Sequence, residues 1–159
     1  MLSVGCLKEN NDHDFRVSLT PETSKKLINK DINVYVEEDC GIKSGFSNED
    51  YSRVGVEILK TQESLIDKSD ILLSINPLDI NFNNISKNAK SKIFIGNFNF
   101  NDLVPDKRFT FLALEKIPRI ARAQSMDILS SQASIAGYQA SLLAAVSYTH
   151  LRAHETTNY

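Results

Sequence analysis

Short apolar runs alternate with amphipathic stretches along most of this chain, a pattern typical of repeated strand–helix units. Apolar runs predict strands at residues 2–7, 32–37, 54–59, 70–75, 93–95 and 109–114. The run at 70–75 is continuously apolar, as expected for a strand buried on both faces, and Pro77 ends it. Five or six such strands with helices between them predict an open, doubly wound, mostly parallel α/β sheet of the Rossmann or flavodoxin-like kind.

Three helix starts can be read from the sequence. Thr20-Pro21-Glu22 supplies a cap, a proline suited to the first turn and an acidic residue at the positive end of the helix dipole. Ser47 is positioned to cap a second helix. From Ser125 onward larger side chains recur every three or four residues among many small ones, which predicts a long, closely packed helix. A buried core helix is the ordinary interpretation of such a stretch.

Residues 146–159 do not continue the pattern of that helix. The run resembles a translated transposase adapter of the kind used in sequencing libraries, and we interpret it as such; a natural, solvated helix end is the alternative. His150 and His154 lie four residues apart in it. No further ligands accompany them, so we assign no metal site.

Composition and charge narrow the class of protein. The 159 residues include 42% hydrophobic and 24% charged residues with a net charge of −2, which is typical of a soluble globular protein. No block of Lys and Arg suggests nucleic acid or an anionic membrane as a partner. No apolar run reaches the roughly 20 residues that span a bilayer, and the first residues lack the features of a secretion signal. We expect Cys6 and Cys40 to be reduced thiols of a cytosolic protein.

Standard signatures of chemistry are absent from the sequence. It contains no Gly-rich dinucleotide turn, no P-loop, no metal-spaced Cys/His cluster and no nucleophile turn. One segment, residues 117–132, concentrates arginines, glutamines, hydroxyls and an aspartate where a strand leads into a helix. Arg119 and Arg122 could position an anionic or amide-bearing ligand, with Asp127 orienting either partner. From the residues alone, a helix cap with local ion pairs explains the segment equally well.

That segment resembles the Pro-Arg-Ile-x-Arg-Ala-Gln-Ser-Met-Asp-x-Leu-Ser-Ser-Gln run of the proton-translocating NAD(P) transhydrogenases. Residues 135–138 continue the resemblance, and residues 8–9, 15–21 and 44–51 are similar to the wider alanine dehydrogenase and transhydrogenase family. The resemblance implies an N-terminal domain at residues 1–124 and an inter-domain helix at 125–145, ending before a second, dinucleotide-binding Rossmann domain. Residues 146–159 form the adapter-like tail.

The family resemblance also implies a function. The NAD(H)-binding alpha subunit transfers hydride between NADH and NADP+, coupled to proton translocation. NADP(H) lies on a partner domain, the alpha subunits form a homodimer, and membrane domains belong to other parts of the assembly. This chain would then be cytoplasmic and peripheral to the inner membrane, with no span of its own, and inactive by itself.

Site residues follow from the resemblance, position by position. Gln124 and Asp127 are expected to act in catalysis by holding the nicotinamide ring and its carboxamide. The expected cofactor contacts are Arg119, Ile120, Ala121, Arg122, Gln124, Ser125, Met126, Asp127 and Ser130. The cofactor itself supplies the hydride chemistry, and protein groups position it.

Two alternatives remain at this point. An alanine dehydrogenase would share Arg16, but its lysine would fall near Ser74–Pro77 and its histidine near Gly96-Asn97, where neither residue type is present. Such an enzyme needs cationic groups for the oxo-acid carboxylate and a proton donor at the carbonyl. The other alternative is a truncated domain with no activity of its own.

Overall fold

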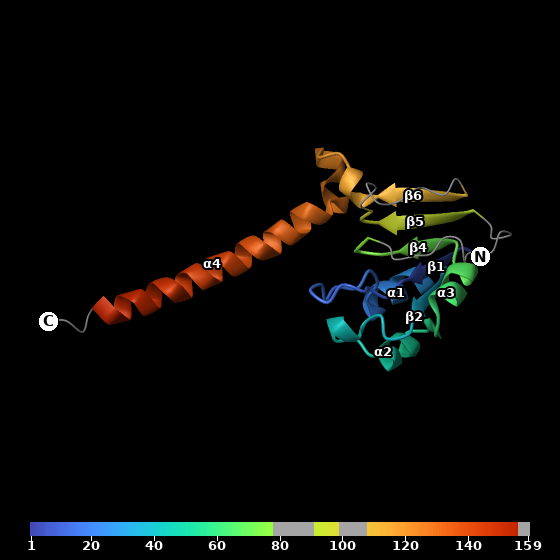
Figure 1. The fold of residues 1–159 in the computed structure, drawn as a ribbon, viewed down its shortest axis with the longest axis horizontal. Coiled ribbons are helices and arrows are strands. Elements are labelled where there is room, and N and C mark those ends of the chain that lie inside the picture. Colours follow the sequence, from blue (N-terminus) through green and yellow to red (C-terminus); the bar gives the residue numbers. More distant parts are fainter. Residues whose placement is uncertain (78–90, 99–107, 156–159) are drawn as a thin grey trace. The chain divides into compact units, whose positions relative to one another are not determined.

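A computed structural model describes residues 1–77, 91–98 and 108–155 of the chain. The chain divides into two compact units, Met1–Glu115 and Lys116–Tyr159. Figure 1 shows the elements of both units coloured along the sequence.

Unit 1 is built on a six-stranded parallel sheet (Figure 1). Its strands are β1 (Ser3–Cys6), β2 (Asn33–Glu37), β3 (Glu57–Leu59), β4 (Ile71–Leu73), β5 (Lys92–Gly96) and β6 (Phe109–Ala113). Their order is β3-β2-β1-β4-β5-β6, and every pairing is parallel. This order is that of the Rossmann fold rather than the flavodoxin-like fold. The predicted α/β fold class is confirmed.

Two of the strands are shorter than their apolar runs. β3 starts only at Glu57, because Val54 ends helix α2 and Gly55 follows it in a turn with φ of +90°. β4 ends at Leu73, short of the predicted Ile75. The carboxyl end of β4 is instead occupied by a polar network that includes Ile75 and Asn76.

The helices of unit 1 begin where their caps predict. Helix α1 (Pro21–Ile28) starts after Thr20, whose side chain accepts a hydrogen bond from the backbone N–H of Thr23. Helix α2 (Asn48–Arg53) starts after Ser47, which is paired in the same way with Asp50. Short 3-10 turns lie at Ile42–Ser44 and Leu114–Lys116. Helix α3 (Gln62–Lys68) escaped prediction because it has only seven residues and its buried side chains, Leu65 and Ile66, are adjacent rather than periodic.

Two hydrophobic clusters lie on opposite faces of the sheet, as the alternation of side chains along each strand requires. One face packs α3 against Leu7, Leu72 and Phe94. The other face packs α1 and α2 against Val4, Cys6, Val34 and Val36. Both cysteines are buried free thiols. The clusters make unit 1 a doubly wound layer structure with its own core.

Unit 2 contains a 3-10 segment (Ala121–Met126) followed by the 28-residue helix α4 (Ile128–Glu155). The helix begins at Ile128 rather than Ser125, and it continues without a break through residues 146–155. Its described side chains are largely exposed, including Ile135 at 64%. The prediction of a closely packed helix is therefore wrong within this chain, because the described part of unit 2 has no second long element to cover α4. Within the described ranges, no helix has the length and apolarity needed to span a membrane.

Candidate functional site

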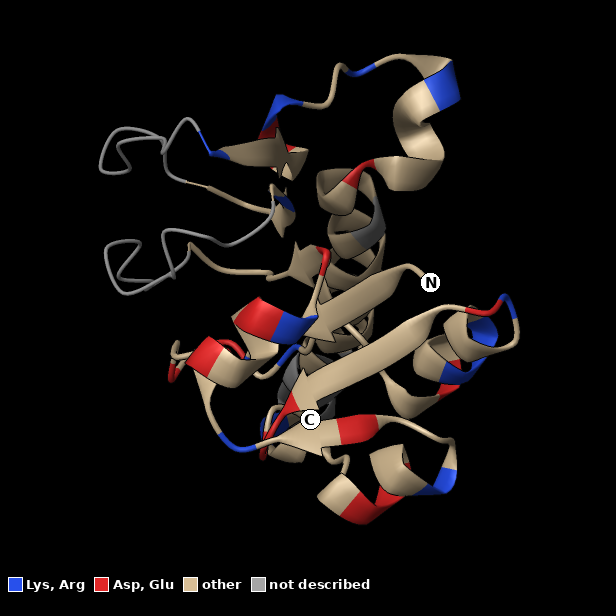
Figure 2. Cartoon of the chain, turned by 90° about the vertical axis from the view of Figure 1, so that its right-hand side faces the viewer, with Lys and Arg blue, Asp and Glu red and all other residues tan. Residues whose placement is uncertain are grey.

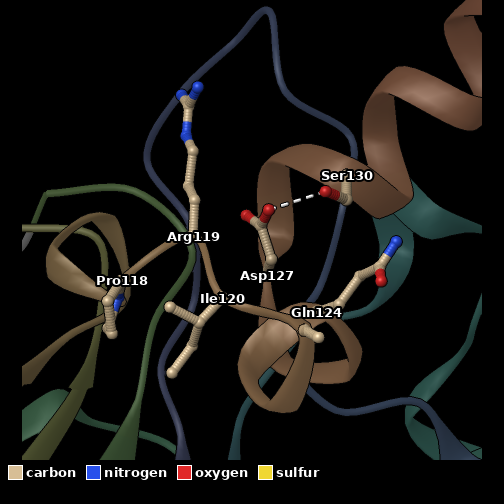
Figure 3. A pocket seen from close by; sticks show the side chains of 7 residues that line it. Pro118, Arg119, Ile120, Gln124, Asp127 and Ser130 are labelled. Atoms are coloured by element: carbon tan, nitrogen blue, oxygen red, sulfur yellow. Dashed lines mark hydrogen bonds between the residues drawn. The ribbon is translucent and has the colours of Figure 1, made fainter.

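A pocket of about 220 Å³ lies within unit 2, where the 3-10 segment meets the start of α4 (Figure 3). It is lined by Pro118, Arg119, Ile120, Ala121, Gln124, Asp127 and Ser130. Ligand pockets that enclose a drug-sized molecule span roughly 300–1,000 Å³. A pocket below that range suits one ring and its substituent rather than a whole dinucleotide.

Asp127 is the most fixed polar group of the pocket. Its carboxylate accepts hydrogen bonds from the backbone N–H of Leu129, at 2.9 Å, and from the hydroxyl of Ser130, at 2.6 Å. Asp127 thereby caps helix α4, where its negative charge also meets the positive end of the helix dipole. The hydrogen bond from Ser130 lowers the pKa of Asp127, as do the Leu129 N–H and the charge of Arg119. The carboxylate is therefore ionised at neutral pH.

Arg119 and Gln124 contribute uncommitted polar groups. Among the described residues, neither the Arg119 guanidinium nor the Gln124 side-chain amide makes a direct hydrogen bond or ion pair. Figure 3 shows the Arg119 side chain extending away from the Asp127–Ser130 pair. Arg119 offers donors only, whereas the amide of Gln124 both donates and accepts. Together with the fixed carboxylate of Asp127, they can recognise a planar group that carries both donors and acceptors, such as a carboxamide.

The pocket gathers most of the residues that the sequence singles out. Arg119, Ile120, Ala121, Gln124, Asp127 and Ser130 line it, whereas Arg122, Ser125 and Met126 do not. Those three belong to the same 3-10 turn but lie outside the lining. Pro118 lines the pocket and was not predicted as a contact, although it directly precedes Arg119 in the same run.

Charge elsewhere on the molecule is mixed. In Figure 2, basic and acidic residues are interspersed along helices and turns on the side that faces the viewer. The net charge of −2 agrees with this distribution. Among the residues that the structure describes, no group of three or more His, Cys, Asp and Glu side chains is arranged to hold a metal ion.

Comparison with known proteins identifies the family. The family model for the alanine dehydrogenase/PNT N-terminal domain matches residues 5–136. The chain belongs to this family. The match includes both the Rossmann-type sheet of unit 1 and every residue that lines the pocket of unit 2.

Within the family, the chain is more similar to transhydrogenases than to alanine dehydrogenases. It is 33% identical over 156 residues to the first of the polypeptides that make up the NAD(P) transhydrogenase alpha subunit of Rickettsia prowazekii, covering 93% of this chain and 41% of the relative. The structure of transhydrogenase from Sinorhizobium meliloti superposes with a TM-score of 0.72 at 28% identity, covering 91% of this chain and 44% of that one. Alanine dehydrogenase of Methanococcus maripaludis is less similar, at 26% identity over 144 residues, covering 84% of this chain and 36% of the relative. The chain thus spans less than half the length of these relatives.

Proposed function

We propose that this chain is the beginning of the NAD(H)-binding alpha subunit of a proton-translocating NAD(P) transhydrogenase. The observation that carries the proposal is the pocket of unit 2, which gathers six of the nine residues expected to contact the nicotinamide. The greater similarity to transhydrogenases than to alanine dehydrogenases supports the same choice. In this proposal the parent enzyme transfers hydride between NADH and NADP+, and the transfer drives proton translocation across a membrane.

The residues of the pocket act by positioning the ring. The nicotinamide supplies the hydride, so the protein has to hold the ring at one angle and keep it from rotating. Asp127 accepts from the carboxamide N–H₂ group, and Arg119 donates to the carboxamide oxygen. Gln124 fixes the ring edge or bridges to the partner nucleotide. The small volume leaves the adenosine and pyrophosphate to a further domain.

Partners and location follow from the relatives, which are subunits of a larger enzyme by name. We infer that NAD(H) binds to this subunit and that NADP(H) binds to a partner domain. The alpha subunits would pair as a homodimer, peripheral to the cytoplasmic side of the inner membrane. Membrane domains of the same assembly would conduct the proton.

Titration with ligand fragments tests the pocket directly. We expect reduced nicotinamide mononucleotide to shift the backbone amide resonances of residues 118–130 in ¹H–¹⁵N spectra of the 159-residue chain, and AMP to leave them unchanged. Arg119→Ala should weaken the binding of the mononucleotide about ten-fold, the effect of losing one charge-assisted hydrogen bond. Arg122→Ala is the matched control, because it removes the same charge from outside the lining. Equal effects of the two substitutions, or shifts caused by AMP alone, would contradict the proposed pocket.

A chimaera tests hydride transfer. Residues 1–136 of this chain would replace the matching region of the Rickettsia prowazekii relative, assembled with the other subunits of that enzyme. We expect transfer from NADH to an NADP+ analogue, reduced about ten-fold or more by Gln124→Ala because the ring is no longer held in one orientation. NADH oxidation that depends on pyruvate and ammonium would instead favour the alanine dehydrogenase alternative.

A further inference from the structure

The first strand and the fourth lie side by side in the sheet of unit 1, although two strands separate them in sequence. The chain runs outward from β1 to β3 and then returns to β4 on the other side of β1. In doubly wound sheets, ligands bind at the carboxyl ends of the strands where the order reverses in this way. In this chain that position is occupied by residues 9–16, after β1, and by residues 74–76, after β4.

Glu9 secures the β4 side of this switch point. The residue is 6% exposed, and its carboxylate accepts hydrogen bonds from the backbone N–H groups of Ile75, at 2.6 Å, and Asn76, at 3.0 Å. It also accepts one from the side-chain amide of Asn76, at 3.1 Å. The side-chain amide of Asn76 also donates to Asp14, 3.2 Å from the nearer carboxylate oxygen.

Asp14 receives a full set of donors from this arrangement. Arg16 donates to its two oxygens from Nε, at 2.8 Å, and from Nη2, at 2.6 Å. The backbone N–H of Arg16 adds a third hydrogen bond, at 3.1 Å, and Asn76 adds the fourth. A forked guanidinium that meets both oxygens of one planar group is the geometry that recognises a carboxylate.

The accessibility of the two side chains differs. Asp14 is 14% exposed, whereas Arg16 is 47% exposed. Solvent therefore reaches the Arg16 guanidinium, while the carboxylate that it grips is one that the chain itself supplies. The hydrogen bonds, those from the Arg16 side chain foremost, lower the pKa of Asp14 to about 2, so the group stays ionised.

We propose that Arg16 and Asn76 form a binding site for small carboxylates at the switch point of unit 1, and that Asp14 occupies this site as an intramolecular ligand. An external carboxylate binds only when the Asp14 side chain is displaced or removed. Glu9 is a positioning residue, since it acts through Asn76. Residues of unit 1 alone form this site, so it is independent of the pocket in unit 2.

Chemical rescue tests the inference. Asp14→Ala removes the internal carboxylate, and sodium formate returns an equivalent free group, with sodium chloride holding the ionic strength constant. We expect formate to raise the thermal unfolding midpoint of the variant saturably, with an apparent affinity about ten-fold or more above that for the unsubstituted chain, because a ligand that binds only the folded state stabilises it. In ¹H–¹⁵N spectra the Arg16 Nε–H resonance should shift over the same concentration range.

Two further variants make the result specific. Asp12→Ala removes a carboxylate from the same loop that pairs with Lys43 instead, so it should not respond to formate. Adding Arg16→Gln to Asp14→Ala should abolish the response. A response of the unsubstituted chain or of Asp12→Ala equal to that of Asp14→Ala would overturn the proposal. A folded Asp14→Ala variant, identified by its dispersed spectrum, that shows no shift at Arg16 would overturn it as well.

Discussion

Unit 1 and unit 2 distribute their polar and apolar residues in opposite ways. Unit 1 has two buried clusters, one on each face of the sheet, and its charged groups at the switch point are paired with one another. Unit 2 is a 3-10 turn and a long helix whose side chains are largely exposed, and its pocket carries uncommitted polar groups. Stability should therefore depend on unit 1, and recognition of the proposed nicotinamide should depend on unit 2. Substitutions can separate the two properties.

The largest effect is expected in the core of unit 1. Phe94 is fully buried, with its ring stacked 5.2 Å from that of Phe111 and edge-on to that of Phe109. Phe94→Ala should lower the free energy of unfolding by about 3–5 kcal/mol, because it leaves a cavity between these rings. Urea denaturation followed by circular dichroism measures the change. Leu112→Ala, on the neighbouring strand but 49% exposed, should cost less than half as much; equal losses would contradict this assignment of the core.

Two glycines give the next effect, with opposite signs in the two units. A methyl group at Gly96 would lie 2.5 Å from the backbone oxygen of Ser74, so Gly96→Ala should destabilise unit 1 by about 1–3 kcal/mol. At Gly137 a methyl group meets nothing within 4 Å, and Gly137→Ala should stabilise helix α4 by about 0.5–1 kcal/mol. Thermal denaturation of the first variant and far-ultraviolet helicity of the second distinguish them. A loss of helicity in the second would indicate that another surface covers α4.

A moderate effect is expected at the start of α4. Asp127→Ala removes the two hydrogen bonds that cap this helix and should reduce its stability by about 0.5–2 kcal/mol. The far-ultraviolet ellipticity should fall, while the urea midpoint of unit 1 remains unchanged. Ser141→Ala, which removes only a hydroxyl bonded to the Gly137 carbonyl, serves as the control and should change the helicity little. A shifted unit 1 midpoint would show that the units are coupled.

The smallest effect concerns acid. Since the pKa of Asp14 is lowered to about 2, the folded state binds this proton less readily than the unfolded state does. The Asp14 contribution is present above about pH 4 and is lost as the pH falls from about 4 to about 2. We expect the unsubstituted chain to lose about 1 kcal/mol more than Asp14→Ala over this interval, a modest amount because solvent screens the pair. Urea denaturation at about pH 5 and about pH 2.5 tests this, and Asp12→Ala should behave like the unsubstituted chain.

The sequence predicts the fold more completely than the site. Six apolar runs become six strands, and Thr20 and Ser47 cap their helices, because alternation and capping are local properties. Helix α3 was missed, since Leu65 and Ile66 give no period. Strand order could not be read locally either, because the pairing of β1 with β4 joins residues that are far apart in the sequence, such as Val4 and Ile71.

The residues of the pocket were found through resemblance rather than through physical pattern. Arg122, Ser125 and Met126 share the motif with the residues that line the pocket, and only the 3-10 geometry of Ala121–Met126 separates the two sets. The network of Glu9, Asp14, Arg16 and Asn76 could not be recognised from sequence alone. Its two halves follow different strands, and only the reversal of strand order brings them together.

The closeness of Asp14 and Arg16 in the sequence has a consequence for competition. A ligand that is tethered by a short flexible segment presents itself to its site at an effective concentration in the millimolar range. Any free carboxylate therefore competes against a local concentration that dilution of the protein does not reduce. In the proposed arrangement the switch point ignores carboxylates present at micromolar levels, and it responds only to one that is abundant or that makes additional contacts.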